Sequence, residues 1–145
     1  MTKVCQPHKI TAKAYLKQTF LLNQKIEAAL LELARLRDLS TSIQSPKLTK
    51  DKIKSTTEKR KVEIIINKII RTETRINNDI DKLVDLQEEI KTHIENIENE
   101  KLRLILHKRY ICLQKWEEIA VDLDLSFRRI TQLHGSALSA LQKIL

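Results

Sequence analysis

The sequence contains very little glycine, proline or aromatic residue. Its 145 residues include one Gly, two Pro and 3% aromatic residues, whereas average proteins contain about 7% Gly and about 5% Pro. Tight hairpin turns and phosphate-binding loops usually require glycine. The composition therefore argues against a strand-rich fold and against an enzyme, and it favours helices packed through Leu, Ile and Val.

Cysteine is also scarce, because Cys5 and Cys112 are the only two in the chain. Two cysteines are too few for a disulfide framework. Cys5 and His8 have a spacing found in metal sites, but no second pair of ligands follows, so no metal and no other cofactor are expected. Cys112 lies among apolar residues and is expected to be a small core residue.

Two further classes of protein lack support in the sequence. No N-terminal signal peptide and no run of about 18 apolar residues is present, so we expect a soluble cytoplasmic protein with no membrane contact. Paired carboxylates, a nucleophile beside a base and a phosphate loop are also missing, so we expect no catalytic residues.

Positive charge is concentrated toward the two ends of the chain. The net charge is +8 overall. It is +7 over residues 1–54, −3 over 55–100 and +4 over 101–145. The basic C-terminal part favours a polyanionic partner such as nucleic acid, with an ordinary solvated surface as the alternative.

Two segments have a seven-residue apolar repeat, which is typical of helices that pack along one seam. The first predicts a helix over about 11–43, beginning near Thr11, with the seam Tyr15, Thr19, Leu22, Ile26, Ala29, Leu33, Leu36, Ser40 and Ile43. The second predicts a helix over about 57–98, with the seam Val62, Ile66, Ile69, Glu73, Ile76, Ile80, Leu83, Gln87, Ile90, Ile94 and Ile97. A basic linker with Pro46 spans 44–56, since proline interrupts helical hydrogen bonding.

These repeats define the first of two expected domains. Residues 1–98 are expected to form a long antiparallel coiled-coil helical hairpin, which buries both seams. Pairing of two chains into a homodimer through the coiled coil is the alternative, and the two arrangements are compatible. Glu73 and Gln87 interrupt the second seam, either to set register or because the partner helix has ended there.

Residues 99–145 are expected to form a second, smaller domain with a helix-turn-helix. A short helix over 99–113 precedes it. From Trp116 onward, apolar residues occupy the positions that pack two helices across a turn: Ile119, Leu123, Leu125, Ile130 and Leu133. Ala120 is small where the helices cross, Asp124 tolerates a left-handed backbone, and Ser126 is a typical N-cap. A plain helix is the alternative.

The second helix of this motif, about 127–141, carries the candidate DNA-binding residues. Phe127, Arg128 and Gln132 lie on its outward side, where Arg can bind guanine and Gln can bind adenine. Further candidates for phosphate contacts or helix capping are Arg109, Lys115, Ser126, Arg129 and Thr131. His134 is expected to be an exposed polar residue, and Trp116 and Tyr110 are expected to pack in the core.

The segment LRLILHKRY…WEEIA…SFRRITQLHGSAL resembles region 4 of sigma-70-type factors. The resemblance implies that Ser126 is the helix cap, that Arg128 and Gln132 face bases, and that Arg129 and Thr131 lie nearer phosphate. The sequence departs from the usual pattern at Phe127 and Arg128, which leaves the preferred DNA sequence open.

Most of the chain, through AYLKQTFLLNQKIEAALLELARLRDLSTSI, DIDKLVDLQEEI and RYICLQKWEEIAVDL…LHGSAL, resembles a phage and prophage family of unknown function. Its members are similar to late transcription regulators of the ArpU and RinA type. This implies a phage protein acting in a bacterial host cell. Two hypotheses follow: a transcription regulator that reads duplex DNA, or an interaction module that binds host RNA polymerase without reading sequence.

Overall fold

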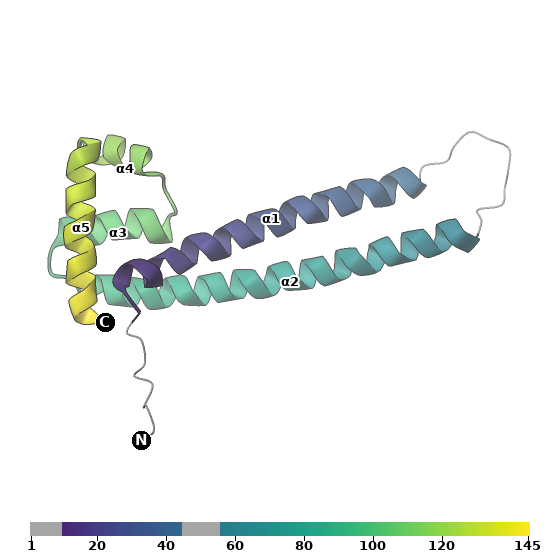
Figure 1. Cartoon of the computed structure of the whole chain (residues 1–145), viewed down its shortest axis with the longest axis horizontal. Helices are drawn as coiled ribbons and strands as arrows, with labels where there is room; N and C mark the ends of the chain where they lie inside the picture. Colours follow the sequence, from purple (N-terminus) through teal and green to yellow (C-terminus); the bar gives the residue numbers. More distant parts are fainter. Residues whose placement is uncertain (1–9, 45–55) are drawn as a thin grey trace, which may run out of the picture. The chain divides into compact units, whose positions relative to one another are not determined.

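The computed structural model describes residues 10–44 and 56–145, and these residues form helices and turns without any strand. The expected all-helical class is therefore confirmed. The elements in chain order are α1 (Ala12–Gln44), α2 (Thr56–Glu95), α3 (Glu100–Leu106), the π-helical turn η1 (His107–Ile111), α4 (Trp116–Leu123) and α5 (Phe127–Ile144) (Figure 1).

The chain divides into two compact units. The two-helix unit, Leu22–Leu83, contains most of α1 and α2. The C-terminal unit contains residues 10–21 and Val84–Leu145, so it combines the first turns of α1 and the end of α2 with α3, η1, α4 and α5. The sequence predicted a boundary near residue 98, and it offered no reason to group residues 10–21 with the C-terminal helices.

The helix ends follow from local capping. Thr11 begins α1 as expected, because its hydroxyl oxygen accepts from the Ala14 amide at 3.3 Å. The predicted end of α2 at residue 98 is three residues too late. The chain turns at Asn96, and the Asn99 side chain then caps α3 by accepting from the Leu102 amide at 3.3 Å. Ile97 lies outside any helix, yet it is buried at 3% exposure.

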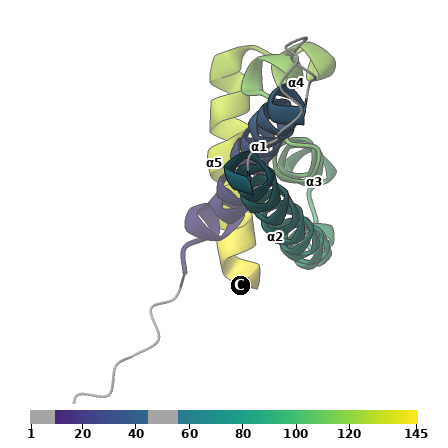
Figure 2. The same cartoon turned by 90° about the vertical axis from the view of Figure 1, so that its right-hand side faces the viewer.

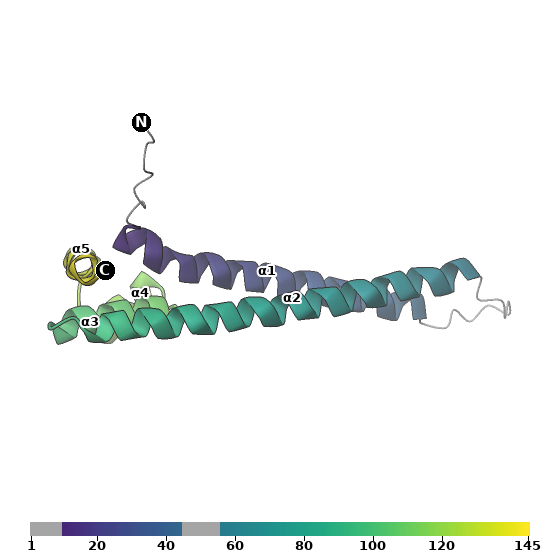
Figure 3. The ribbon, with the colours of Figure 1, turned by 90° about the horizontal axis from the view of Figure 1, so that it is seen from below.

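Within the two-helix unit, α1 and α2 run antiparallel and side by side (Figures 1 and 3). Three ion pairs establish the direction, because their partners descend along α2 as they ascend along α1: Lys25–Asp79, Glu32–Arg75 and Arg37–Glu73. The buried core of this unit is small and consists of Ile26, Ala29, Leu33 and Ile76.

At alternate positions of the second seam, the buried residue is not the one that the repeat predicted. Thr72 and Asp79 are buried at 5% and 2% exposure, whereas Ile80 is 39% exposed. Adjacent isoleucines at 64–66 and 69–70 allow two seams of the same period, so the pattern alone could not select one. The second interruption, Gln87, donates from Nε2 to the carbonyl of Ile111 at 3.1 Å, a role that its seam position did not suggest.

The C-terminal unit has a larger core. One buried cluster joins residues from α1, α2, α3, η1, α5 and the turn between α2 and α3: Ala12, Leu16, Ile90, Ile94, Ile97, Leu102, Leu106, Tyr110, Ala137 and Leu141. Helix α5 crosses α3, as two perpendicular views show (Figures 1 and 2). Cys112 was wrongly expected in the core: it is exposed in the turn after η1, where the helical pattern has ended.

Candidate nucleic-acid interface

A sharp turn connects α4 to α5. Asp124 ends α4 in the left-handed conformation (φ 52°, ψ 47°), and the Leu125 amide donates to the carbonyl of Ala120 at 3.0 Å. Ser126 then caps α5, since its Oγ accepts from the Arg129 amide at 3.2 Å. Asp tolerates the left-handed region better than most residues, and Ser is a preferred N-cap, so the local sequence accounts for this turn.

A second apolar cluster fixes α4 against α5 and α3. Its buried members are Ile105, Ile119 and Ile130, which are at most 1% exposed. Residues packed around them are Trp116, Ala120, Leu123, Leu125 and Leu133. All five positions that the sequence predicted to pack across the turn therefore belong to one cluster. This anchoring holds the start of α5 in a fixed orientation relative to α4.

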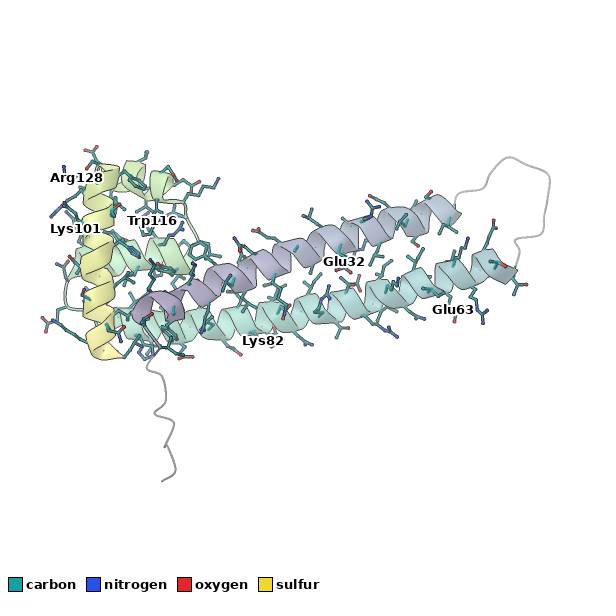
Figure 4. All side chains as sticks on the ribbon, viewed as in Figure 1. Glu32, Glu63, Lys82, Lys101, Trp116 and Arg128 are labelled. Carbon is teal, nitrogen blue, oxygen red and sulfur yellow. The ribbon has the colours of Figure 1, made fainter. Side chains whose placement is uncertain are left out.

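The side of α5 opposite this cluster is exposed. At about 100° per residue, Arg128 and Gln132 lie on the far side of the helix from the buried residues Ile130 and Ala137. Phe127 is 57% exposed, although it is a large apolar residue. Arg128 points away from α5, whereas Trp116 points into the space between α3, α4 and α5 (Figure 4).

Several of the candidate polar groups already have partners within the chain. Thr131 donates from Oγ1 to the carbonyl of Phe127 at 3.0 Å. Arg129 Nη1 lies 3.5 Å from Gln132 Oε1, which is at the limit of a hydrogen bond. Arg128 forms no hydrogen bond or ion pair with any described residue. Its guanidinium is therefore available to an external partner.

Arg109 is half-buried and directed toward the aromatic residues of the unit. Its guanidinium carbon is 4.2 Å from the centre of the Phe20 ring and 4.7 Å from the centre of the Trp116 ring. Its Nη1 donates to the carbonyl of Gln114 at 2.8 Å. Burial lowers the pKa of Arg109, and electrostatic interactions with Tyr110 and Glu117 oppose this effect. These contacts give Arg109 a packing role between α1, η1 and α4.

Lys115 lies at the start of α4 with an exposed side chain. Its amide donates to Glu118 Oε2 at 3.0 Å. The preceding turn is held by Asp122, which accepts from Lys108 Nζ at 3.0 Å and from Gln114 Nε2 at 3.2 Å. The hydrogen bond from Lys108 is the main reason that the pKa of Asp122 is lowered.

His134 was wrongly expected to be an exposed polar residue. It is half-buried, its Nε2 lies 2.9 Å from Tyr110 Oη, and its ring centre is 4.6 Å from that of Trp116. Burial lowers its pKa to about 4, and the positive charges of Arg109 and Lys13 add to the effect. His134 is therefore neutral near pH 7 and contributes to packing rather than to phosphate binding.

The roles of two residues of this region were not predicted from the sequence. Phe20 closes the aromatic group over Arg109 although it comes from the distant α1, and no local pattern connects the two residues. Val121 on α4 is 80% exposed. The sequence did offer a signal for Val121, because this apolar residue stands between Ala120 and Asp122 on the outward side of a short helix.

The described residues thus belong to an all-helical protein with an anchored C-terminal helix. The chain belongs to the family described as "Protein of unknown function (DUF1492)", whose model matches residues 42–142. No curated protein and no solved structure matches the chain. No described helix is long and apolar enough to cross a membrane. Residues 10–44 and 56–145 contain no group of His, Cys, Asp or Glu suited to a metal ion, and Cys5 and His8 lie outside these ranges.

Proposed function

We propose that this protein is a DNA-binding transcription regulator that reads duplex DNA with the first turns of α5. The observation that carries the proposal is the arrangement of this helix. Its inner side is anchored by Ile130 and Ala137, and its outer side presents Arg128 and Gln132 without apolar cover. A helix that is fixed on one side and polar on the other can enter the major groove in a defined orientation.

The exposed side chains suit base recognition. Arg128 and Gln132 are four residues apart, so they lie on the same side of α5, about 6 Å apart along its axis. Arg forms paired hydrogen bonds with guanine, Gln forms them with adenine, and an apolar side chain such as Phe127 can contact the thymine methyl group. Arg129, Lys115 and the exposed N-terminal end of α5 are suited to phosphate.

The resemblance of LRLILHKRY…SFRRITQLHGSAL to sigma-70 region 4 supports this function independently of the geometry. The similarity to ArpU-type and RinA-type regulators supports a phage-encoded protein that acts in the cytoplasm of a bacterial host. In this proposal the turn from Asp124 to Ser126 is that of a helix-turn-helix, and the antiparallel α1 and α2 form a coiled-coil hairpin. A homodimer would place two reading helices on one DNA molecule.

The experiment starts with selection of bound duplexes from a random library, followed by fluorescence anisotropy on the selected and scrambled duplexes at several salt concentrations. We expect selective binding that persists as salt rises, because base contacts depend less on salt than phosphate contacts do. Arg128→Ala should weaken binding to the selected duplex by about 5-fold to 150-fold, which corresponds to about 1–3 kcal/mol.

Arg71→Ala is the matched control, because it removes the same charge from an exposed position on α2. It should leave binding to the selected duplex nearly unchanged. If both variants weaken binding equally, the attraction comes from overall charge and not from base contacts. If no duplex is selected and no salt-resistant binding is seen, the proposal fails.

A second candidate function is binding to host RNA polymerase through α4. The outward side of this helix carries the 80% exposed Val121 together with the exposed acidic residues Glu117, Glu118 and Asp122. Carboxylates repel phosphate, so this surface suits a protein partner better than DNA. Val121→Glu should abolish capture of purified RNA polymerase while Arg128→Ala has no effect. Equal capture by all variants would exclude this surface.

A further inference from the structure

The two-helix unit has an apolar surface on one flank of its seam. On α2, Ile66, Ile70 and Ile80 are 40%, 54% and 39% exposed, and on α1 Leu30 is 47% exposed. The buried core of this unit contains only three large aliphatic side chains and one alanine. The unit therefore exposes more large aliphatic side chains than it buries.

Ion pairs identify the two flanks of the seam. Glu32 Oε2 and Arg75 Nη2 are 2.7 Å apart on one flank, and Figure 4 shows Glu32 directed toward α2. Arg37 Nη2 and Glu73 Oε1 are 2.7 Å apart on the other flank. In an antiparallel pair of helices with a seven-residue repeat, positions seven apart lie on the same flank.

Four of the seven exposed large aliphatic residues of the described two-helix unit lie on the flank of Arg37 and Glu73, whereas Leu31, Leu39 and Ile64 lie elsewhere. Leu30 is seven residues before Arg37, and Ile66 and Ile80 are each seven residues from Glu73, on either side of it. The ion pair therefore stands at the centre of a surface that extends roughly 21 Å along α2, at 1.5 Å per residue. Ile70, three residues before Glu73, widens this surface.

We propose that this surface, which we call the Arg37–Glu73 flank, binds the same flank of a second copy of the chain. A twofold axis that runs parallel to the helices beside this ion pair would bring Arg37 of each copy to Glu73 of the other. A surface with both signs of charge at its centre is complementary to itself only under such a rotation, in which each contact occurs twice. Charge complementarity thus selects a second copy as the occupant.

The same axis pairs the apolar residues. Leu30 is seven residues before Arg37 and Ile80 is seven residues after Glu73, so in this antiparallel unit the two lie at the same height along the helices. The rotation keeps these heights and places Leu30 of each copy against Ile80 of the other. Two Leu30–Ile80 contacts and two Arg37–Glu73 pairs then form across the interface.

This interface would form the homodimer named in the proposed function, but its test does not depend on DNA binding, because it uses only residues of the two-helix unit. Its first test is the mass of the purified chain by sedimentation equilibrium over a range of concentrations. The wild type should form dimers, and Ile80→Glu should weaken dimerisation at least tenfold by placing an unpaired charge against Leu30 of the second copy. A monomeric wild type at all concentrations would overturn the proposal.

Ile64→Glu is the matched control for Ile80→Glu. Ile64 is 49% exposed on the same helix, but it is nine residues before Glu73 and so lies on the opposite side of α2. This variant should still dimerise, and circular dichroism should show equal helix content in both variants. If the two variants dimerise equally well, or lose dimers equally, the Arg37–Glu73 flank is not the interface.

A charge exchange tests the twofold contact directly. Arg37→Glu has two acidic residues at the centre of the flank, and Glu73→Arg has two basic residues there, so each variant alone should be mainly monomeric. Mixing the two should form heterodimers, because each copy supplies the charge that the other lacks. Native mass spectrometry distinguishes the species. A mixture that stays monomeric would show that the central charges do not meet across copies.

Discussion

The two units of this protein use the same helical geometry but stabilise it differently. The C-terminal unit has thirteen buried apolar residues in two clusters, whereas the two-helix unit has four in one cluster. All five aromatic residues of the chain, Tyr15, Phe20, Tyr110, Trp116 and Phe127, belong to the C-terminal unit. The scarce large side chains are thus concentrated in one unit.

The two units therefore obtain their stability from different interactions. Aromatic side chains bury large areas, and stacking of rings and a guanidinium contributes beyond the area buried. Exposed ion pairs contribute little, because water screens the charges and ordering long side chains costs entropy. The C-terminal unit can therefore be stable by itself, while the two-helix unit has reason to bury its exposed flank against another surface.

The largest effect on stability is expected when core volume is removed from the C-terminal unit. Ile119 is fully buried between α3, α4 and α5, so Ile119→Ala should lower the free energy of unfolding by about 2–5 kcal/mol. Urea denaturation followed by fluorescence measures this, because Trp116 is the sole tryptophan and packs against Ile119 in the same cluster.

Ile76→Ala is the corresponding change in the two-helix unit, where Ile76 is 4% exposed. Circular dichroism should show that this variant loses helix at a lower urea concentration than the wild type does. The unfolding transition followed by Trp116 fluorescence should be unchanged. A shift of the Trp116 transition equal to that of Ile119→Ala would mean that the two units unfold as one.

A smaller effect is expected from Arg109, which the sequence suggested as a DNA contact. Arg109→Met keeps much of the side-chain volume but loses the charged hydrogen bond to Gln114 and the stacking on Phe20 and Trp116. Stability by the same urea assay should fall by about 2 kcal/mol. Arg128→Met, on the exposed side of α5, should change stability by less than about 0.5 kcal/mol. The reverse order would mean that Arg109 is not a packing residue.

The local features of the fold were predictable from the sequence. Thr11, Asp124 and Ser126 determine their turns through the chemistry of one residue, and the apolar positions from Ile119 to Leu133 have the spacing expected of two helices that pack across a turn. Such signals depend on residues close together in the chain. They therefore gave the limits of α1, α2 and α5 within about three residues and gave the side of α5 that is buried, whereas the helix predicted over 99–113 ends at Leu106 and is followed by η1.

Contacts between distant segments could not be predicted in the same way. Phe20 and Arg109 meet only because α1 and η1 pack together, and His134 is half-buried only because Tyr110 and Trp116 surround it. In α2, neighbouring isoleucines made the choice between Asp79 and Ile80 ambiguous until α1 was placed. A remote segment can bury a residue and change its role, and the sequence next to that residue then gives no sign of the change.

The stability of the C-terminal unit should depend on pH through His134. The folded-state pKa of His134, about 4, is below the unfolded value of about 6.5, so the unfolded state binds more protons between these values. Stability is then complete above pH 6.5 and falls as the pH drops toward 4. The loss should be about 1–2 kcal/mol, because solvent reaches part of the ring and screens its charge.

His134→Gln isolates this effect. Urea midpoints followed by Trp116 fluorescence at pH 7.5 and pH 4.5 should differ more for the wild type than for the variant. Acidic residues such as Asp122, whose lowered pKa acts at still lower pH, contribute equally to both proteins. The same pH dependence in wild type and variant would rule out His134 as its source.

The smallest effect on stability is expected from an exposed ion pair of the two-helix unit. Glu32 and Arg75 are 53% and 50% exposed at their side chains, so Glu32→Gln should lower the stability of the two-helix unit by no more than about 0.5 kcal/mol by thermal circular dichroism. Dimerisation should also be unchanged, since this pair lies on the flank opposite Arg37 and Glu73. A loss above about 1.5 kcal/mol would mean that exposed ion pairs stabilise this unit substantially, and the exposed isoleucines would then no longer be needed to explain how it stays folded.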